Sequence, residues 1–203
     1  MLFELVLYAT IILVLLFFLF LIFWKFWFLR DPDRQIPKGN NIVSPADGKI
    51  IRIMKIDRQE LKVKKGYLGK IYTLSTDLKD PGFLVSIFMS PLNVHFQRAP
   101  IDGAIKKVKH TKGRFIAADT LRALNNEKNE IIIDDIKVIQ IAGFLARRIS
   151  CFIKKNEKVK KGQRIGLINL GSQVTMLLPK NVKISVKEGQ HVKAGETIIG
   201  EEL

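Results

Sequence analysis

Residues 159–166 read Val-Lys-Lys-Gly-Gln-Arg-Ile-Gly, and residues 192–200 read Val-Lys-Ala-Gly-Glu-Thr-Ile-Ile-Gly. In both stretches a valine leads into a Lys-x-Gly turn, and apolar residues follow it. Glycine permits the tight turn because it has no Cβ, and the apolar positions supply the next strand. The two stretches therefore predict two copies of one turn-plus-strand unit.

A second pair of similar stretches supports this duplication. Residues 44–50 read Ser-Pro-Ala-Asp-Gly-Lys-Ile and residues 99–105 read Ala-Pro-Ile-Asp-Gly-Ala-Ile, so each is a Pro-x-Asp-Gly turn that enters a strand. Turns of this kind are common, and two matches could also arise by chance. Units built this way resemble those of lipoyl- and biotinyl-type barrel-sandwich domains. We expect the body to be a duplicated barrel-sandwich of that kind.

The rest of the body predicts short strands and no long amphipathic helix. The predicted strands are β-branched runs between turns, most of them about four to eight residues long. They cover residues 49–56, 70–74, 83–89, 104–108, 131–133, 136–141 and 182–186. The expected fold class is therefore mainly β.

The N-terminus has a different character. Residues 5–24 are an uncharged run, which as a helix would rise about 30 Å, the thickness of a bilayer's hydrocarbon core. Bulky aromatics end the run and basic residues follow, which is typical of a retained transmembrane helix with the body on the cytoplasmic side. The alternative, a helix buried in a soluble core, is disfavoured because no charge interrupts the run. We expect residues 1–37 to form a membrane anchor and exit segment and residues 38–203 to form the β domain.

Charge is concentrated in the body. The net charge of +15 lies entirely in residues 38–203, which carry 31 basic and 16 acidic side chains. A body this basic predicts an anionic partner. We expect an anionic membrane surface and no nucleic acid, because the basic residues are not interleaved with aromatic ones and the chain carries an anchor.

Few residues offer conventional catalytic chemistry. A single cysteine, Cys151, excludes an internal disulfide and a multi-cysteine zinc site, and we expect no metal. The phosphate-loop, zinc-protease and Gly-x-Ser-x-Gly motifs are missing from the sequence. Two stretches stand out instead. Residues 86–103 place His95 three residues before Arg98, and residues 168–179 hold a Gly-Ser pair between two apolar runs.

Leu170-Gly171-Ser172 resembles the self-cleavage site of pyruvoyl-dependent phosphatidylserine decarboxylases, most closely their short form, whose archaeal relatives act on archaetidylserine. Other motifs occur in the family's order. They are Phe-Leu-Arg-Asp-Pro-Asp-Arg-Gln-Ile-Pro at 28–37, Val-Ser-Pro-Ala-Asp-Gly at 43–48, Phe-Met-Ser-Pro-Leu-Asn-Val-His at 88–95, Lys-Gly-Arg-Phe at 112–115 and Asn-Asn-Glu-Lys-Asn-Glu at 125–130. A Gly-Ser pair alone is a weak signal, whereas this ordered set is specific.

The resemblance implies a self-processing enzyme. The Ser172 hydroxyl would attack the Gly171 carbonyl, and elimination would divide the chain into residues 1–171 and 172–203, which stay together as a heterodimer. Ser172 would become a pyruvoyl group, a built-in cofactor that forms a Schiff base with the amine of a serine phospholipid. Loss of carbon dioxide would then turn phosphatidylserine, or the archaeal ether lipid, into its ethanolamine counterpart. Glycine before serine suits the attack because no Cβ obstructs it.

Three further residues receive roles from the same resemblance. His95 matches a family histidine and is expected to be an acid or base, with a structural role as the alternative. Asp47 matches the family's acidic residue and would orient the groups of self-cleavage, although it could simply brace its turn, as Asp102 could. Long bacterial forms have a second histidine where this chain has Arg98, so a complete acid–histidine–serine triad is not carried over. Arg98 is a candidate for binding the substrate's carboxylate or phosphate.

The alternative function is a membrane-anchored lipoyl-like carrier or adaptor module without catalysis. A carrier's modified lysine lies at a hairpin tip, whereas Lys55 is predicted within a strand. An adaptor needs a long coiled-coil hairpin, and the sequence has no heptads. The residues therefore favour the decarboxylase.

Overall fold

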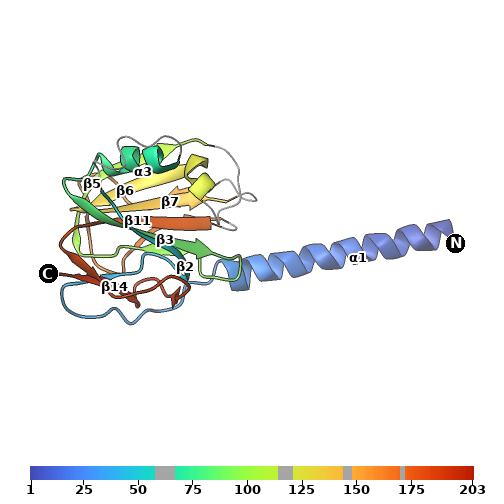
Figure 1. Ribbon diagram of the computed structural model, residues 1–203. Helices are drawn as coiled ribbons and strands as arrows, with labels where there is room; N and C mark the ends of the chain where they lie inside the picture. Colours follow the sequence, from blue (N-terminus) through green and yellow to red (C-terminus); the bar gives the residue numbers. More distant parts are fainter. Residues whose placement is uncertain (58–66, 114–120, 144–147, 170–171) are drawn as a thin grey trace.

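The computed structural model describes residues 1–57, 67–113, 121–143, 148–169 and 172–203, and a long helix stands away from a β-rich body (Figure 1). The elements are α1 (Leu2–Ile22), η1 (Phe23–Phe28), β1 (Asn41–Val43), β2 (Gly48–Lys55), α3 (Tyr67–Ser75), β3 (Pro81–Met89), β4 (Phe96–Arg98), β5 (Gly103–Thr111), η2 (Leu121–Asn125), β6 (Lys128–Ile133), β7 (Ile136–Ala142), β8 (Ile149–Cys151), β9 (Lys158–Val159), β10 (Arg164–Ile168), β11 (Ser172–Pro179), β12 (Val182–Ile184), β13 (His191–Val192) and β14 (Ile198–Glu202).

The α-helix α1 and the π-helix η1 form one continuous apolar helix. Together they cover Leu2–Phe28, and an 18-residue stretch of this helix has a mean hydropathy of 3.1, so the helix is long and apolar enough to cross a membrane. No residue of α1 is buried against the body, whereas Phe28 at the end of η1 is fully buried in it. The helix fits the predicted anchor, and its last residue, Phe28, is packed into the body.

The strands of the body form three antiparallel sheets. The largest has the order β13-β2-β3-β11-β7-β6-β5-β9, and the smaller ones are β1-β14-β12 and β4-β10-β8. One face of the large sheet packs around Val85, Val138 and Val174 in the main core, and its other face meets Ile71 of α3 and Leu124 of η2. The expectation of a mainly β body is confirmed, and the sheets form an open sandwich rather than a closed barrel.

The two Pro-x-Asp-Gly segments contact each other reciprocally. The Val43 N–H donates to the Pro100 carbonyl at 3.0 Å, and the Arg98 N–H donates to the Pro45 carbonyl at 2.9 Å. The strand after each turn pairs with the strand before a Lys-x-Gly turn, because β2 pairs with β13 and β5 pairs with β9. The sequence repeats are therefore repeats in space, related by an approximate two-fold axis.

The Lys-x-Gly turns occupy equivalent places in the two halves. The Gly195 N–H donates to the Ser44 carbonyl at 2.8 Å, and the Gly162 N–H donates to the Ala99 carbonyl at 2.9 Å. Both glycines have positive φ, 76° and 82°, which an L side chain rarely adopts. The side chain of Ile36 lies against both and leaves no room for a Cβ on either. The exit segment thus packs where the two halves meet.

One predicted strand is wrong. Residues 70–74 belong to the helix α3, because Ile71 and Leu74 lie three positions apart and both bury against the outer face of the sheet. The β-branched run around Ile71 indicated a strand, and packing overrode that local preference. Lys55, predicted in the middle of a strand, is the last residue of β2 and pairs with Phe83 of β3.

Candidate active site

Ser172 is the first residue of β11 and is fully buried. The strand register places it between Met89 of β3 and Ala142 of β7. Its hydroxyl donates to the Met89 thioether sulfur at 3.3 Å, and a thioether is a weak acceptor. β11 begins at the end of the sheet from which α1 departs (Figure 1). The serine oxygen therefore lies in a buried environment at the anchor end of the body, and among the described residues its hydroxyl has only this weak acceptor.

A chain of buried side-chain amides extends from Met89. Gln97 Nε2 lies 3.7 Å from the Met89 sulfur, Gln140 Nε2 donates to Gln97 Oε1 at 2.8 Å, and Asn129 Nδ2 donates to Gln140 Oε1 at 2.9 Å. All three amide side chains belong to residues that are at most 1% exposed. Because buried polar groups need partners, each amide fixes the orientation of the next. The surroundings of Ser172 are thus polar but carry no formal charge on this side.

His95 is fully buried just before β4 and stacks on the end of the anchor. Its Nδ1 lies 2.8 Å from the Asn93 carbonyl oxygen, and its ring centroid lies 4.2 Å from that of Phe28. Burial lowers the pKa of His95 to about 4, the hydrogen bond to Asn93 opposes this, and the nearby Arg30 guanidinium adds to it. His95 is therefore neutral at ordinary pH.

The contacts of His95 also fix its tautomer. A carbonyl oxygen can only accept, so Nδ1 carries the proton and Nε2 presents its lone pair. Nε2 is buried and has no hydrogen-bond partner among the described residues. An unpartnered buried nitrogen with a free lone pair is suited to accept a proton.

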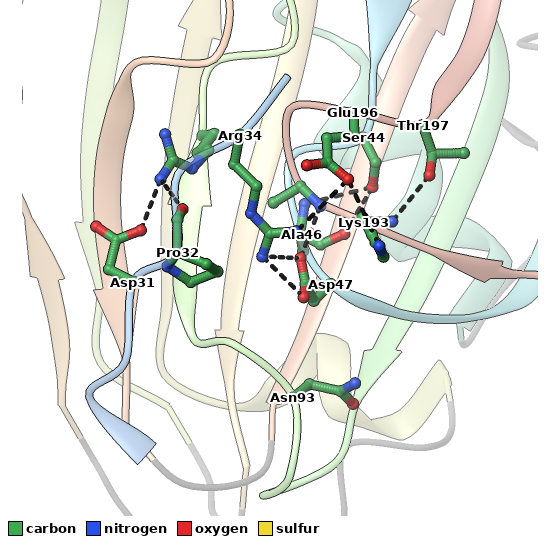
Figure 2. Close-up of polar contacts among 12 residues, drawn as sticks. Asp31, Pro32, Arg34, Ser44, Ala46, Asp47, Asn93, Lys193, Glu196 and Thr197 are labelled. Carbon is green, nitrogen blue, oxygen red and sulfur yellow. Dashed lines mark hydrogen bonds and ion pairs between the residues drawn. The ribbon is translucent and has the colours of Figure 1, made fainter. Parts of the chain in front are cut away.

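Asp47 makes more side-chain contacts than Asp102, its counterpart in the other repeat. It accepts from the Ala194 N–H at 2.7 Å, just as Asp102 accepts from the Lys161 N–H at 2.9 Å, so both brace a Lys-x-Gly turn. Asp47 alone of this pair also binds an arginine, with Arg34 Nη2 at 2.9 and 3.0 Å from its two carboxylate oxygens (Figure 2). The side chains of Arg34 and Asp47 are only 5% and 13% exposed. Bracing of a turn therefore accounts for the side-chain contact described for Asp102, but for only part of the contacts of Asp47.

The strand register brings Asp47 toward Ser172. Lys49 pairs with Phe88, and one residue further along β3 Met89 pairs with Ser172. Asp47, two residues before Lys49, therefore lies at the same end of the β2-β3-β11 strands as Ser172. Gly171, the other half of the predicted cleavage site, lies outside the described residues.

Arg98 has partners within the chain. Its guanidinium donates to Asp31 Oδ1 at 2.6 Å, to the Gly162 carbonyl at 2.9 Å and to the Pro32 carbonyl at 3.3 Å. Arg98 is 8% exposed. These contacts fasten the exit segment to the body and use three of the five N–H donors of Arg98, whose buried Nε has no partner among the described residues.

Comparison with known proteins identifies the family. Residues 21–200 match the family described as phosphatidylserine decarboxylase. The chain belongs to this family. It is 46% identical over 180 residues to the phosphatidylserine decarboxylase proenzyme of Chlorobium phaeobacteroides, covering 86% of this chain and 77% of the relative. It is also 46% identical over 182 residues to the putative archaetidylserine decarboxylase proenzyme of Methanocaldococcus jannaschii, covering 85% and 87%.

Three groups around the site of this decarboxylase were not assigned from the sequence. They are Arg34, which binds Asp47, Phe28, which stacks on His95, and Gln97, which approaches Met89. Arg34 and Phe28 both lie in the motif at residues 28–37, so that motif was the available signal. The sequence does not indicate what these two residues contact, because their partners lie elsewhere in the chain.

The described residues include no cluster of three or more His, Cys, Asp or Glu side chains able to hold a metal ion. The cavity of about 480 Å³ between α3 and β5 is lined by Lys107 and Asn126 but not by Ser172 or His95, so it belongs to another part of the surface.

Proposed function

We propose that this chain is a proenzyme that cleaves itself between Gly171 and Ser172 and then decarboxylates the headgroup of a serine phospholipid, with a diacyl or an archaeal ether backbone. The observation that carries the proposal is the Ser172 hydroxyl, fully buried at the start of β11 and bonded to a thioether. Relatives named as decarboxylase proenzymes support it.

Maturation would begin with an acyl shift. A bond forms from Ser172 Oγ to the Gly171 carbonyl carbon, and the bond from that carbon to the Ser172 nitrogen breaks, which leaves an ester. Elimination across the Cα–Cβ bond of residue 172 releases residues 1–171 with a terminal carboxylate and leaves dehydroalanine. Addition of one water and loss of ammonia leave the pyruvoyl group. The weak Met89 acceptor supports this role, since it leaves the serine oxygen free to attack.

His95 would accept and donate protons, first in maturation and then in turnover. Its neutral ring and unpartnered Nε2 support a role as the base that accepts the Ser172 proton during maturation. In turnover the same Nε2 would hold a proton for the carbon that loses carbon dioxide. It must first acquire that proton, because burial keeps the resting ring neutral.

Asp47 would act with Arg34 as an orienting pair. The bidentate contact and its low exposure hold both side chains in one geometry. Asp102, which lacks such an arginine contact among the described residues, serves as an internal reference for turn bracing alone.

A pyruvoyl group at residue 172 supplies an electrophile for the headgroup amine and a sink for the electron pair left by carbon dioxide. The chain's own residues would exclude water and hold neutral amides around that position. Such surroundings favour decarboxylation, because the ionised carboxylate of the substrate is poorly solvated there.

The fold supports a membrane-bound heterodimer. β11 is hydrogen-bonded on both edges, to β3 and β7, which would keep residues 172–203 in place after cleavage. The apolar helix would anchor residues 1–37, with the catalytic body, residues 38–203, on the cytoplasmic side of the membrane. The basic surface would face anionic lipid.

The test is the intact mass of the purified protein beside Ser172→Ala and the control Ser185→Ala, an exposed serine in the same part of the chain. We expect two masses for the wild type and for Ser185→Ala, and one for Ser172→Ala. The cleaved samples should release carbon dioxide from serine phospholipid, and Ser172→Ala should not. A wild-type sample that decarboxylates as one uncleaved chain would refute the proposal.

A further inference from the structure

Arg30 lies at the junction between the anchor and the body, two residues after η1. Its Nη1 donates to the Trp27 carbonyl at 2.6 Å, its Nη2 donates to the Leu92 carbonyl at 2.5 Å, and its guanidinium lies 4.5 Å from the Trp27 ring centroid. These hydrogen bonds use two of its five N–H donors. In the described ranges no carboxylate forms an ion pair with Arg30, whereas Arg34 and Arg98 are both paired. Arg30 therefore keeps donors for an anion.

The turn that Arg30 contacts is rigid and carries an exposed leucine. Asn93 Oδ1 accepts from the Ser90 N–H at 2.8 Å and from the Ser90 hydroxyl at 2.9 Å, and the Asn93 N–H donates to the Ser90 carbonyl at 3.0 Å. Leu92, inside this turn, is 62% exposed. The Asn93 carbonyl also accepts the hydrogen bond from His95, so the turn that carries Leu92 positions the histidine.

Leu92 continues the apolar surface of the anchor. Trp27 and Phe26 are 48% and 69% exposed at the end of the helix, and Arg30 bridges Trp27 to the Leu92 turn. If α1 and η1 span the bilayer, the end of η1 lies at the interface, where tryptophan and snorkelling arginine are typical. Leu92, joined to that end through Arg30, would lie at the same depth.

We infer that Arg30, Trp27 and Leu92 form a lipid-phosphate site at the membrane surface, in which Arg30 binds the phosphodiester of the lipid whose headgroup reaches His95. The inference rests on the proposed function for the identity of that lipid. Leu92 contacts the acyl-chain boundary, and Arg30 binds the phosphate as a planar cation with several donors. Arg30 would thus have the phosphate-binding role that was first expected of Arg98.

The electrostatics of the junction agree with this geometry. Burial lowers the pKa of Arg30, and the Asp47 carboxylate opposes that effect. Arg30 in turn contributes to the lowered pKa of His95. Its guanidinium therefore lies within electrostatic range of both groups.

The position of Leu92 is tested without any activity measurement. Leu92→Cys in a Cys151→Ser background is labelled with an environment-sensitive fluorophore, and the full chain is placed in phosphatidylcholine nanodiscs that contain headgroup-nitroxide lipid. We expect blue-shifted emission and strong quenching. Asp102→Cys, in the exposed turn of the other repeat, is the control and should show neither. Equal signals at positions 92 and 102 would overturn the membrane contact.

The phosphate role of Arg30 is tested with Arg30→Gln, Arg30→Lys and the control Arg52→Gln, an exposed arginine of β2. For serine lipid in neutral vesicles, we expect Arg30→Gln to raise KM about 10–100-fold with little change in kcat, the cost of a charged hydrogen bond. Arg30→Lys should recover part of that loss, and Arg52→Gln should match the wild type. An Arg30→Gln enzyme with wild-type KM would overturn the site.

Two comparisons separate the possible failures. If Arg30 binds bulk anionic lipid instead of the substrate's phosphate, added phosphatidylglycerol should change the wild-type KM, and the soluble headgroup glycerophosphoserine should inhibit wild type and Arg30→Gln equally. That result would overturn the substrate assignment. If the quenching pattern holds while no sample decarboxylates, the membrane contact stands and the proposed function fails.

Discussion

At the residue scale, the neutral state of His95 has a measurable consequence. Because burial lowers its pKa to about 4, the ring stays a base above that pH and is lost as a base when the pH falls through about 4. We expect the self-cleavage rate to be independent of pH between about pH 5 and pH 8 and to decrease below about pH 5. His95→Gln should slow cleavage about 10²–10⁴-fold at any of these pH values. A time course of the two bands on a denaturing gel measures both.

The same shift affects stability. Between about pH 6.5 and pH 4 the unfolded chain binds a proton at His95 that the folded chain does not, so the folded state loses stability as the pH falls through this window. His95→Gln should flatten that part of the curve in urea titrations. An unchanged slope would show that His95 is not the titrating group.

Asp47 and Asp102 form a matched pair for mutation. Both accept from a backbone N–H of a Lys-x-Gly turn, but in the described structure Asp47 also binds Arg34. We expect Asp102→Asn to cost about 1 kcal/mol of stability and to leave self-cleavage at the wild-type rate. Asp47→Asn should slow cleavage at least 10-fold, about 1.4 kcal/mol of barrier. Equal cleavage rates in the two variants would reduce Asp47 to a turn brace.

At the element scale, β11 determines whether the cleaved protein stays together. Met176 lies in the middle of this strand and is fully buried in the main core. Met176→Ala should therefore lower the free energy of unfolding by about 2–5 kcal/mol and promote loss of residues 172–203 from the cleaved protein. Lys183→Ala, exposed on β12, should leave both unchanged. Urea denaturation and native separation provide the two measurements.

Elements also show what the sequence could and could not predict. The Lys-x-Gly and Pro-x-Asp-Gly turns predicted the duplicated body, because glycine and aspartate have local backbone roles in these turns. The strand predicted around Ile71 was wrong, since Ile71, Tyr72 and Thr73 locally favour a strand, whereas contact with the sheet favours a helix. Ser172, His95 and Asp47 were selected as candidate site residues through motifs, and their roles stay predictions. Arg34 was missed as a partner of Asp47 because a sequence does not state which charges meet after folding.

At the scale of the whole molecule, the anchor sets the topology. If the basic residues after the helix lie on the cytoplasmic side, as proposed, protease added to sealed right-side-out cells should leave the body intact. Alkaline carbonate should not extract the protein, because the apolar helix and not surface charge would hold it. Digestion of the body from outside would reverse the proposed orientation, and extraction by carbonate would exclude a spanning helix.

If the helix spans the membrane as proposed, the join between helix and body would couple the active site to bilayer thickness. The helix runs without a loop into Phe28, which stacks on His95, and Arg98 fastens Asp31 a few residues later. A helix that must tilt or sink to match a thinner or thicker hydrocarbon layer therefore moves the body with it instead of pivoting on a flexible tether. Hydrophobic mismatch would then change the height of the catalytic groups above the lipid. Acyl-chain length of the host membrane becomes a physical control on turnover, separate from the chemistry of the headgroup.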